Sequence, residues 1–412
     1  MAFHWIGNSV YLTHLSLTNF RNFTRLDLEV PRGPLLLVGD NAQGKTSILE
    51  AVYFLATFAS FHASNERQLI NFFAIREPLA VARILAGYER GGAQHRLEVR
   101  VIQEPSGGSL RLRKEILLDG VKRKLSEVVG QFNAVLFLPQ MLGVIDGAPE
   151  ERRRYLNLAL AQVIPGYSVA LAGYNRTLAQ RNALLKQLNE RGGNPTQLDY
   201  WDEQLVAFGA QLLHARIWAV QDLEQLATRM HSELTRGEEV LRFSYQPAYD
   251  PLTLPPGQFA LPFDAMVDRS KFSISEICTG FLEKLIQLRN EEIMRGITTI
   301  GPHRDELRLL SNGIDLGHYG SRGQVRSALM SLKLAEVGWM REKSGQWPVL
   351  LLDEVLAELD GQRRSDLLSR LVESEQSLMT TTDLDLFAPE FVRKAHLWQV
   401  KAGRVEEVNN AT

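Results

Sequence analysis

Residues 35–55 read LLLVGDNAQGKTSILEAVYFL, and this stretch combines three features of one structural unit. A fully apolar run, typical of a buried strand, comes first. It leads into the pattern Gly-x4-Gly-Lys-Thr at residues 39–46, and a segment with helical spacing follows. The backbone N–H groups of such a loop wrap phosphates at the beginning of a helix, where the helix dipole favours anions. The stretch therefore predicts a P-loop nucleotide-binding fold of the α/β class.

Every residue of this loop is a candidate ligand of a nucleotide. Lys45 would pair with the β- and γ-phosphates, and the hydroxyl of Thr46 would hold Mg²⁺. Because the backbone would surround the phosphates, we expect contacts to ATP from Gly39, Asp40, Asn41, Ala42, Gln43, Gly44, Lys45 and Thr46. A chance glycine loop is the alternative, and the flanking strand and helix argue against it.

A second apolar strand ends in two acids. The segment PVLLLDEV, residues 348–355, places Asp353 and Glu354 at the end of the apolar run. A carboxylate at the end of a buried strand must be solvated, paired or bound to a metal. We interpret Asp353 as support for the Mg²⁺ ion and Glu354 as the general base that polarises the attacking water. A solvated strand end is the alternative.

The pattern GSRGQ, residues 320–324, precedes the acidic strand and lies far downstream of the P-loop. A chain that leaves the nucleotide fold and later returns to it has the layout of an ABC-type P-loop ATPase head with an inserted helical arm. In such a head, Ser321, Gly323 and Gln324 lie too far from their own P-loop to touch the same nucleotide. They begin a helix, so they would complete the ATP site of a second copy. A simple helix cap is the alternative.

The chain divides into three predicted parts. We expect residues 1–148 to form the N-terminal half of the ATPase head and residues 296–412 to form its C-terminal half. Residues 149–295 carry apolar stripes at helical spacing, the breaker GGNP at 192–195 and a proline-rich linker. This middle part predicts a helical hairpin, either a protruding arm or a bundle packed on the core.

The composition is ordinary for a globular protein. The 412 residues are 45% hydrophobic and 23% charged, with a formal net charge of −2, so nucleic-acid binding would need local basic patches. There are three candidate clusters: Arg111, Arg113 and Lys114; Lys122, Arg123 and Lys124; and Arg152, Arg153 and Arg154. A solvated charged face is the alternative explanation for each cluster. The single cysteine, Cys278, allows no internal disulfide, and no apolar run is long enough to span a bilayer. We expect a cytoplasmic protein.

Motifs spread over nearly the whole chain complete the pattern. They are LTNFRNF at 17–23, the P-loop with its helix, GAPEERRRYLN at 147–157, GPHRDEL at 301–307, LLLDEVLAELD at 350–360 and TTTD at 380–383. Together they resemble the RecF family, the bacterial recombination-repair ATPases of the SMC-like ABC group, and GPHRD is the most specific match. The chain departs from the family pattern at Arg322, where glutamine is usual, and at Glu354, where the family often has aspartate.

The resemblance implies further site residues. Gln140, within FLPQML, would be a Q-loop residue, with a plain turn as the alternative. Arg21, together with Asn19 and Asn22, would approach the base or the ribose, although an ordinary strand end explains these residues equally well. The threonines at 380–382 stand where transporters have a switch histidine, which leaves the γ-phosphate sensor unassigned. The GPHRD block is open to a structural or a signalling role.

The resemblance also implies a function in DNA replication and repair. ATP and Mg²⁺ would close a homodimer on double-stranded DNA near single-strand gaps, and slow, DNA-stimulated hydrolysis would release it. RecO and RecR would be partners in loading RecA during recombinational and SOS repair. The alternatives are the ATPase subunit of a membrane transporter and a defence-associated SMC-like ATPase. The interrupted head and the missing switch histidine argue against the transporter, and GPHRD favours the repair protein.

Overall fold

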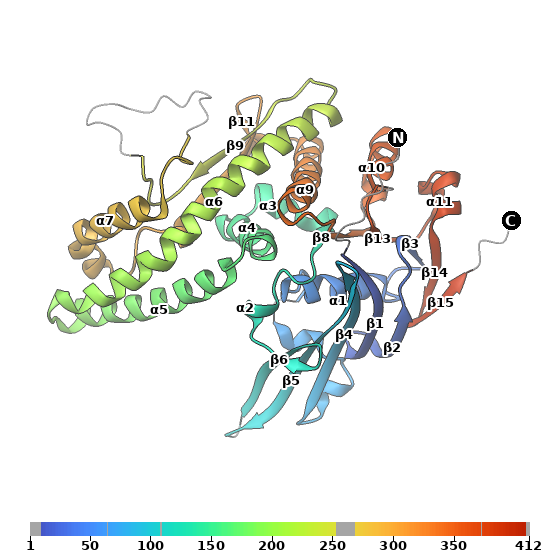
Figure 1. Ribbon diagram of the computed structural model, residues 1–412, viewed down its shortest axis with the longest axis horizontal. Coiled ribbons are helices and arrows are strands. Elements are labelled where there is room, and N and C mark those ends of the chain that lie inside the picture. Colours follow the sequence, from blue (N-terminus) through green and yellow to red (C-terminus); the bar gives the residue numbers. More distant parts are fainter. Residues whose placement is uncertain (1–9, 64, 108, 253–267, 372, 409–412) are drawn as a thin grey trace. The chain divides into compact units, whose positions relative to one another are not determined.

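The computed structural model describes residues 10–408 except residues 64, 108, 253–267 and 372. The chain clusters into two compact units, which Figure 1 shows as ribbons: residues 1–141 with 336–412, and residues 142–335. We call them the first and the second unit. Most of the predicted proline-rich linker, including Pro255, Pro256 and Pro262, lies outside the described residues.

The first unit contains a six-stranded sheet whose strands come from both ends of the chain. In spatial order they are β15 (Arg404–Val408), β14 (His396–Lys401), β3 (Gly33–Val38), β13 (Gln376–Thr381), β12 (Val349–Asp353) and β8 (Ala134–Phe137). All neighbours pair in parallel except β14 and β15. The carboxyl ends of β3 and β12 therefore lie at the same edge of the sheet, which is where open α/β sheets bind their ligands.

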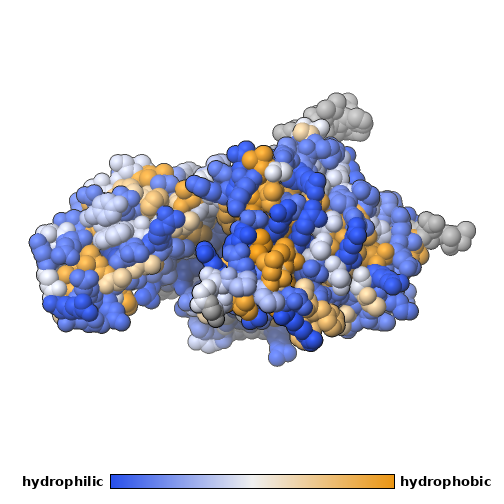
Figure 2. Space-filling model, turned by 90° about the horizontal axis from the view of Figure 1, so that it is seen from below, coloured by the Kyte–Doolittle hydropathy of each residue, from blue (hydrophilic) through white to orange (hydrophobic). Residues whose placement is uncertain are grey.

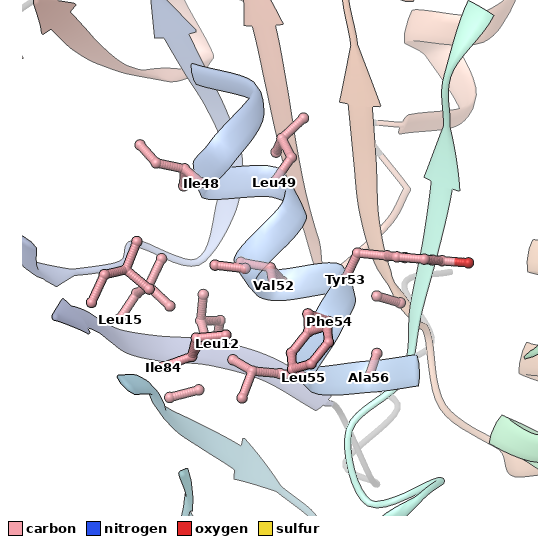
Figure 3. Packing of buried hydrophobic residues seen from close by; sticks show 14 of the residues in the cluster. Leu12, Leu15, Ile48, Leu49, Val52, Tyr53, Phe54, Leu55, Ala56 and Ile84 are labelled. Carbon is pink, nitrogen blue, oxygen red and sulfur yellow. The ribbon is translucent and has the colours of Figure 1, made fainter. Parts of the chain in front are cut away.

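The helix after the P-loop, α1 (Lys45–Thr57), is almost entirely buried. It packs against strands of the parallel sheet and of a second, antiparallel sheet. Figure 3 shows its apolar side chains, among them Val52 and Leu55, beside Leu12 and Ile84 of the antiparallel sheet. A helix that meets a sheet on two sides must be apolar nearly all round, which explains the run ILEAVYFLA.

The antiparallel sheet has a core face and a charged face. Its strands, in order, are β2 (Phe23–Glu29), β1 (Val10–Phe20), β4 (Ala80–Arg90), β5 (Ala93–Ser106), β6 (Ser109–Leu118) and β7 (Val121–Lys122). Leu97, Val99 and Val101 of β5 point into the core and are at most 1% exposed. The residues between them form cross-strand ion pairs, such as Arg83 with Glu98 at 2.8 Å, which are a usual way to stabilise a solvated sheet face.

The second unit consists mainly of helices. Its long helices are α4 (Pro149–Val163), α5 (Tyr167–Arg191), α6 (Asp199–Leu234), α7 (Ile274–Arg295) and the first part of α9 (Arg322–Ser344). A small sheet has the strand order β11 (Ile314–Asp315), β10 (Glu306–Ser311) and β9 (Leu241–Gln246). The short helices α3 (Gly143–Asp146) and α8 (Leu316–Tyr319) belong to this unit, whereas α2 (Leu125–Val128), α10 (Gly361–Leu371) and α11 (Pro389–Lys394) belong to the first. Helices α5 and α6 flank the predicted breaker, and α7 packs along both (Figure 1).

The GPHRD block lies in the interior of the second unit. The carboxylate of Asp305 is 1% exposed and accepts hydrogen bonds from Arg216 at 2.6 Å and from the Tyr245 hydroxyl at 2.7 Å. The His303 ring contacts the Tyr174 hydroxyl at 2.7 Å through Nδ1. These contacts join α5, α6 and β9, so they support a structural role for the block.

The boundaries of the two units differ from the division predicted from the sequence. Residues 296–335 cluster with the helical unit because β10 pairs with β9 and the first part of α9 contacts His231 of α6 and Glu239. The assignment of 296–412 to a C-terminal half of an ATPase head stays a prediction. Within the described residues, no helix combines the length and the hydropathy needed to cross a membrane.

Candidate functional site

A cleft of about 1040 Å³ opens beside the P-loop in the first unit, large enough for a nucleotide. Its lining combines the P-loop, the acids after β12 and an irregular segment after α1. The lining residues at the loop and the acids are Asn41, Ala42, Gln43, Gly44, Lys45, Thr46, Ser47, Gln140, Asp353 and Glu354. The structure therefore brings together residues that the sequence analysis selected separately.

Glycine is required twice in the loop because other backbone and side-chain atoms approach closely. A Cβ on Gly39 would lie 2.3 Å from the carbonyl oxygen of Val400. A Cβ on Gly44, whose φ is 115°, would lie 2.6 Å from Asn22 Nδ2 and 2.8 Å from the Phe23 ring. Both glycines thus let the loop pack tightly against these neighbours.

The Lys45 ammonium group lies inside the loop. Lys45 is 3% exposed, and its Nζ donates to the carbonyl oxygens of Gly39 and, at 3.2 Å, of Asp40. The same nitrogen lies 3.4 Å from Glu354 Oε1. Glu354 has φ of 51°, an unusual backbone conformation for this residue type that is frequent at functional sites. The cation and the candidate base therefore face the same part of the cleft.

A chain of oxygen atoms links the P-loop to the acidic strand. The Thr46 hydroxyl lies 3.0 and 3.1 Å from the two carboxylate oxygens of Asp353. The Thr380 hydroxyl donates to Asp353 at 2.7 Å and accepts from the Glu354 backbone N–H at 2.9 Å. Burial raises the pKa of the Asp353 carboxyl, and the hydrogen bonds from Thr380 and Thr46 oppose this shift only in part. Thr380, at the predicted switch position, is therefore hydrogen bonded to both acidic residues.

The oxygen donors of this chain suit a hard cation. Mg²⁺ prefers one or two protein oxygens together with water and phosphate oxygens, and Thr46 and Asp353 supply a hydroxyl and a carboxylate side by side. Among the described residues, no group of three or more His, Cys, Asp or Glu could hold a metal without further ligands. A cation here would thus depend on oxygen atoms of a bound phosphate.

Arg21 lines the cleft, but its charge is paired. Its guanidinium makes two hydrogen bonds of 2.6 Å to the carboxylate of Glu50, which is 1% exposed. Asn22 also lines the cleft and donates to the Gln43 carbonyl oxygen at 3.3 Å. Asn19 is outside the lining that the structure describes. The strand end at 17–23 thus forms a wall of the cleft.

The segment between α1 and β4 contributes lining residues that the sequence analysis missed. His62 is the most informative of them, because it lines the same cleft as Asp353 and Glu354. Phe72 also lines the cleft and is 65% exposed, and the Arg76 guanidinium lies 4.5 Å from its ring centre. The segment has neither helical nor strand periodicity, so no sequence signal selected it.

Apolar side chains are scattered among polar ones on the face of the molecule that Figure 2 shows. In the first unit, Phe72, Phe73 and Leu79 are each more than 60% exposed. Of these three residues, Phe72 lines the cleft.

The GSRGQ segment belongs to the second unit and begins α9. The Ser321 hydroxyl accepts from the backbone N–H of Gln324 at 3.2 Å, and the Gln324 side-chain oxygen accepts from the Ser321 N–H at 3.0 Å. This reciprocal pair is a capping box. Ser321, Arg322 and Gly323 are exposed, so the cap leaves the first turn of the helix accessible to a ligand.

Most of the basic residues proposed as DNA contacts are paired with acids or carbonyl groups. Arg113 bonds Glu104 and Glu115, Lys122 bonds Glu115, Lys114 bonds Glu66, Arg152 bonds Glu306, and Arg153 donates to the Asp305 carbonyl oxygen. For Arg111 and Arg123 the described structure shows no ion pair of this kind. Five of the nine candidates are thus engaged by acids or a carbonyl group, whereas Arg123 and Lys124 are exposed.

Comparison with known proteins gives one consistent result. The family model described as "RecF/RecN/SMC N terminal domain" matches residues 11–395. The "DNA replication and repair protein RecF" of Roseiflexus castenholzii is 39% identical over 411 residues, which covers 96% of this chain and 99% of the relative. The protein of the same name from Chloroflexus aurantiacus is 38% identical with the same coverage.

Solved structures agree with the sequence relatives. "Structure of the recombination mediator protein RecF-ATP in RecFOR pathway" aligns with a TM-score of 0.82 and 29% identity, over 99% of this chain and 100% of the other. The corresponding RecF-ATPrS structure aligns with a TM-score of 0.81. An Smc head domain from Pyrococcus furiosus, at 14% identity and a TM-score of 0.50, shares the fold alone. The predicted α/β ATPase-head fold is confirmed.

Proposed function

The chain belongs to the RecF family of DNA replication and repair proteins, and from this membership we propose that it is an ATPase that dimerises on DNA when ATP is bound. One observation supports the proposal most directly. The P-loop residues Lys45 and Thr46 lie beside Asp353 and Glu354 in one cleft, with Thr46 and Asp353 in contact. That arrangement is what phosphoryl transfer by P-loop enzymes needs.

The roles of the cleft residues follow from their positions. Lys45 would exchange its contacts with loop carbonyl groups for contacts with the β- and γ-phosphates. Thr46 and Asp353 would hold Mg²⁺, which would neutralise charge on the phosphate oxygens. Glu354 would accept the proton of the attacking water, because its carboxylate reaches the cleft beside Lys45. Gln140 and His62 line the same cleft and would contact the phosphates of ATP or the attacking water.

The exposed beginning of α9 would act on the nucleotide of a second copy. Ser321 and Gly323 present exposed backbone and hydroxyl groups at the start of a helix of 23 residues, and the helix dipole there favours an anion. Gln324 would hold this turn in shape through its capping contacts. Two copies facing each other would then enclose two ATP molecules.

The proposed biological role is DNA repair. Relatives are named for DNA replication and repair, and two similar structures are described as recombination mediators in the RecFOR pathway. We therefore propose binding to double-stranded DNA near gaps, slow DNA-stimulated hydrolysis, and action with RecO and RecR in loading RecA. Family membership favours this role over a transporter subunit or a defence-associated ATPase.

A mass measurement tests the proposal. The Glu354→Gln protein should double its mass by light scattering when ATP and Mg²⁺ are added, because ATP binds and is hydrolysed slowly. Adding Ser321→Arg should abolish the doubling, since a bulky cation would occupy the turn that meets the partner's ATP. Ser275→Arg is the matched control, because Ser275 is an exposed serine of the same unit on α7. If the mass stays at one copy with DNA and saturating ATP present, the proposed mechanism is wrong.

A further inference from the structure

The GSRGQ turn is connected to a buried charged network inside the second unit. The side chain of Gln324 uses its oxygen to cap Ser321 and its nitrogen to donate to Glu239 Oε1 at 3.2 Å. Glu239 lies in the loop between α6 and β9. The position of Ser321 therefore depends, through one side chain, on a carboxylate from another part of the chain.

Glu239 accepts hydrogen bonds at both of its oxygens. Its second oxygen, Oε2, contacts the Ser311 hydroxyl at 2.9 Å and His231 Nε2 at 3.1 Å. Burial raises the pKa of the Glu239 carboxyl, but the hydrogen bonds from Ser311, His231 and Gln324 outweigh burial, so that its pKa lies below the ordinary value. The group is thus an ionised acceptor for three donors.

His231 completes the network. It is 0% exposed, stands in the last turn of α6, and contacts the Ser331 hydroxyl of α9 through Nδ1 at 3.0 Å. Ser331 donates its single hydroxyl hydrogen to the Ser327 carbonyl oxygen at 2.8 Å, so Nδ1 must be the donor toward Ser331. The other ring nitrogen, Nε2, faces the Glu239 carboxylate. The His231 ring therefore links the end of α6 and Glu239 to α9.

We propose that Glu239 and His231 are positioning residues for the trans-acting ATP contact of Ser321. Glu239 holds the Gln324 amide in the rotamer that caps Ser321, and His231 holds Glu239 against α9. This inference rests on the proposed function, since it assigns the pair to the same ATP-dependent closure. It also means that α6, a helix of 36 residues or about 54 Å at 1.5 Å per residue, carries one of the two positioning residues in its last turn and is followed closely by the other.

Glu239→Gln in the Glu354→Gln protein is the first test. A carboxamide has one acceptor oxygen, and its NH₂ group would face a donor from Gln324 or from His231. The loss of a hydrogen bond to a charged group weakens an interaction about tenfold or more. A closed dimer would contain two such sites, so the dimer dissociation constant with ATP and Mg²⁺ should rise by about 100-fold. The affinity of the first-unit cleft for ATP, measured on single copies, should be unchanged.

Two control variants separate positioning from general damage. Glu238→Gln removes the same charge from the adjacent, exposed position and should leave dimerisation unchanged. Thr298→Val removes buried hydrogen bonds to Arg181 and Asn182 elsewhere in the second unit. It should lower thermal stability without weakening the dimer. Ser311→Ala removes only one hydrogen bond to Glu239, so it should weaken the dimer by a smaller factor. This variant remains testable if Glu239→Gln fails to fold.

The outcomes distinguish this inference from the proposed function. Normal dimerisation of Glu239→Gln, or of Ser311→Ala if that is the folded variant, would overturn the positioning role. Equal weakening by Thr298→Val would also overturn it, because the effect would then be structural. If Ser321→Arg left dimerisation intact, the proposed function itself would fail, whatever the result at Glu239.

Discussion

The Thr46 hydroxyl is shared between the two carboxylate oxygens of Asp353, at 3.0 and 3.1 Å, although the residues are 307 positions apart in the chain. The contact joins the beginning of α1 to the end of β12. It exists because β13 pairs in parallel with both β3 and β12 and brings their carboxyl ends to one edge of the sheet. This edge of the sheet holds the candidate catalytic residues.

Glu354→Gln should slow ATP hydrolysis by about 100-fold or more, since general bases contribute factors of this size. ATP binding should be retained. The substitution removes a negative charge that lies 3.4 Å from the Lys45 ammonium group and would otherwise compete with the phosphates for it. Phosphate release and equilibrium nucleotide binding measure the two effects. Glu373→Gln, at an exposed position after α10, is the control. Normal hydrolysis by the Glu354 variant would place the general base elsewhere.

Lys45→Ala should weaken ATP binding by about 100-fold, because charge-assisted hydrogen bonds to the phosphates are lost. Fluorescence titration with a labelled ATP analogue measures the affinity. Lys401→Ala removes an exposed lysine from β14 in the same unit and should bind ATP normally. Equal affinity of the Lys45 variant and the parent protein would show that the cleft does not bind the phosphates as proposed.

His303 should make the second unit less stable in mild acid. Burial lowers the pKa of His303 to about 4, whereas an unfolded histidine has a pKa near 6.5. The unfolded chain therefore takes up the proton first, so stability is complete above pH 6.5 and is lost as the pH falls toward 4. Linkage predicts a loss of about 2 kcal/mol between pH 7.5 and pH 5 from this one residue.

Calorimetry of the parent and of His303→Gln at the two pH values measures this contribution. The variant should begin less stable, because the contact to the Tyr174 hydroxyl is altered, but it should lose less stability on acidification. His95→Gln, at a partly exposed histidine position in the first unit, is the control. If the His303 variant lost as much stability on acidification as the parent protein, His303 would not be the source of the acid sensitivity.

Arg21→Met should destabilise the first unit by about 3 kcal/mol, because it leaves the buried Glu50 carboxylate without its bidentate partner. Changing Glu50 to Met as well should restore much of the loss. Thermal unfolding measures both effects. A nucleotide titration of the double variant then tests the separate expectation that Arg21 contacts the base or ribose. If that variant binds ATP normally, Arg21 serves the wall of the cleft only.

The sequence identified the P-loop and the acidic strand that line the cleft, but not the segment after α1 that also lines it. GDNAQGKT and LLLDE are local patterns whose chemistry is legible without a structure, and the cleft contains residues from both. His62 lines the cleft from an irregular segment that no periodicity marks. The sequence predicts a switch position at the threonines 380–382, yet only the structure shows that Thr380 hydrogen bonds both to Asp353 and to the Glu354 backbone.

The sequence by itself determined the phosphate loop, the acidic strand, the helical hairpin and the family of this protein, because these depend on residue type and spacing along a short segment. Tertiary structure alone decided which charges are paired. Arg21 is bound by Glu50, Arg216 by Asp305, and Gln324 by Glu239. Such pairs join residues that are distant in the chain. A charge excluded from water needs a partner, and tertiary packing decides which residue supplies it, so no local sequence pattern predicts the pair.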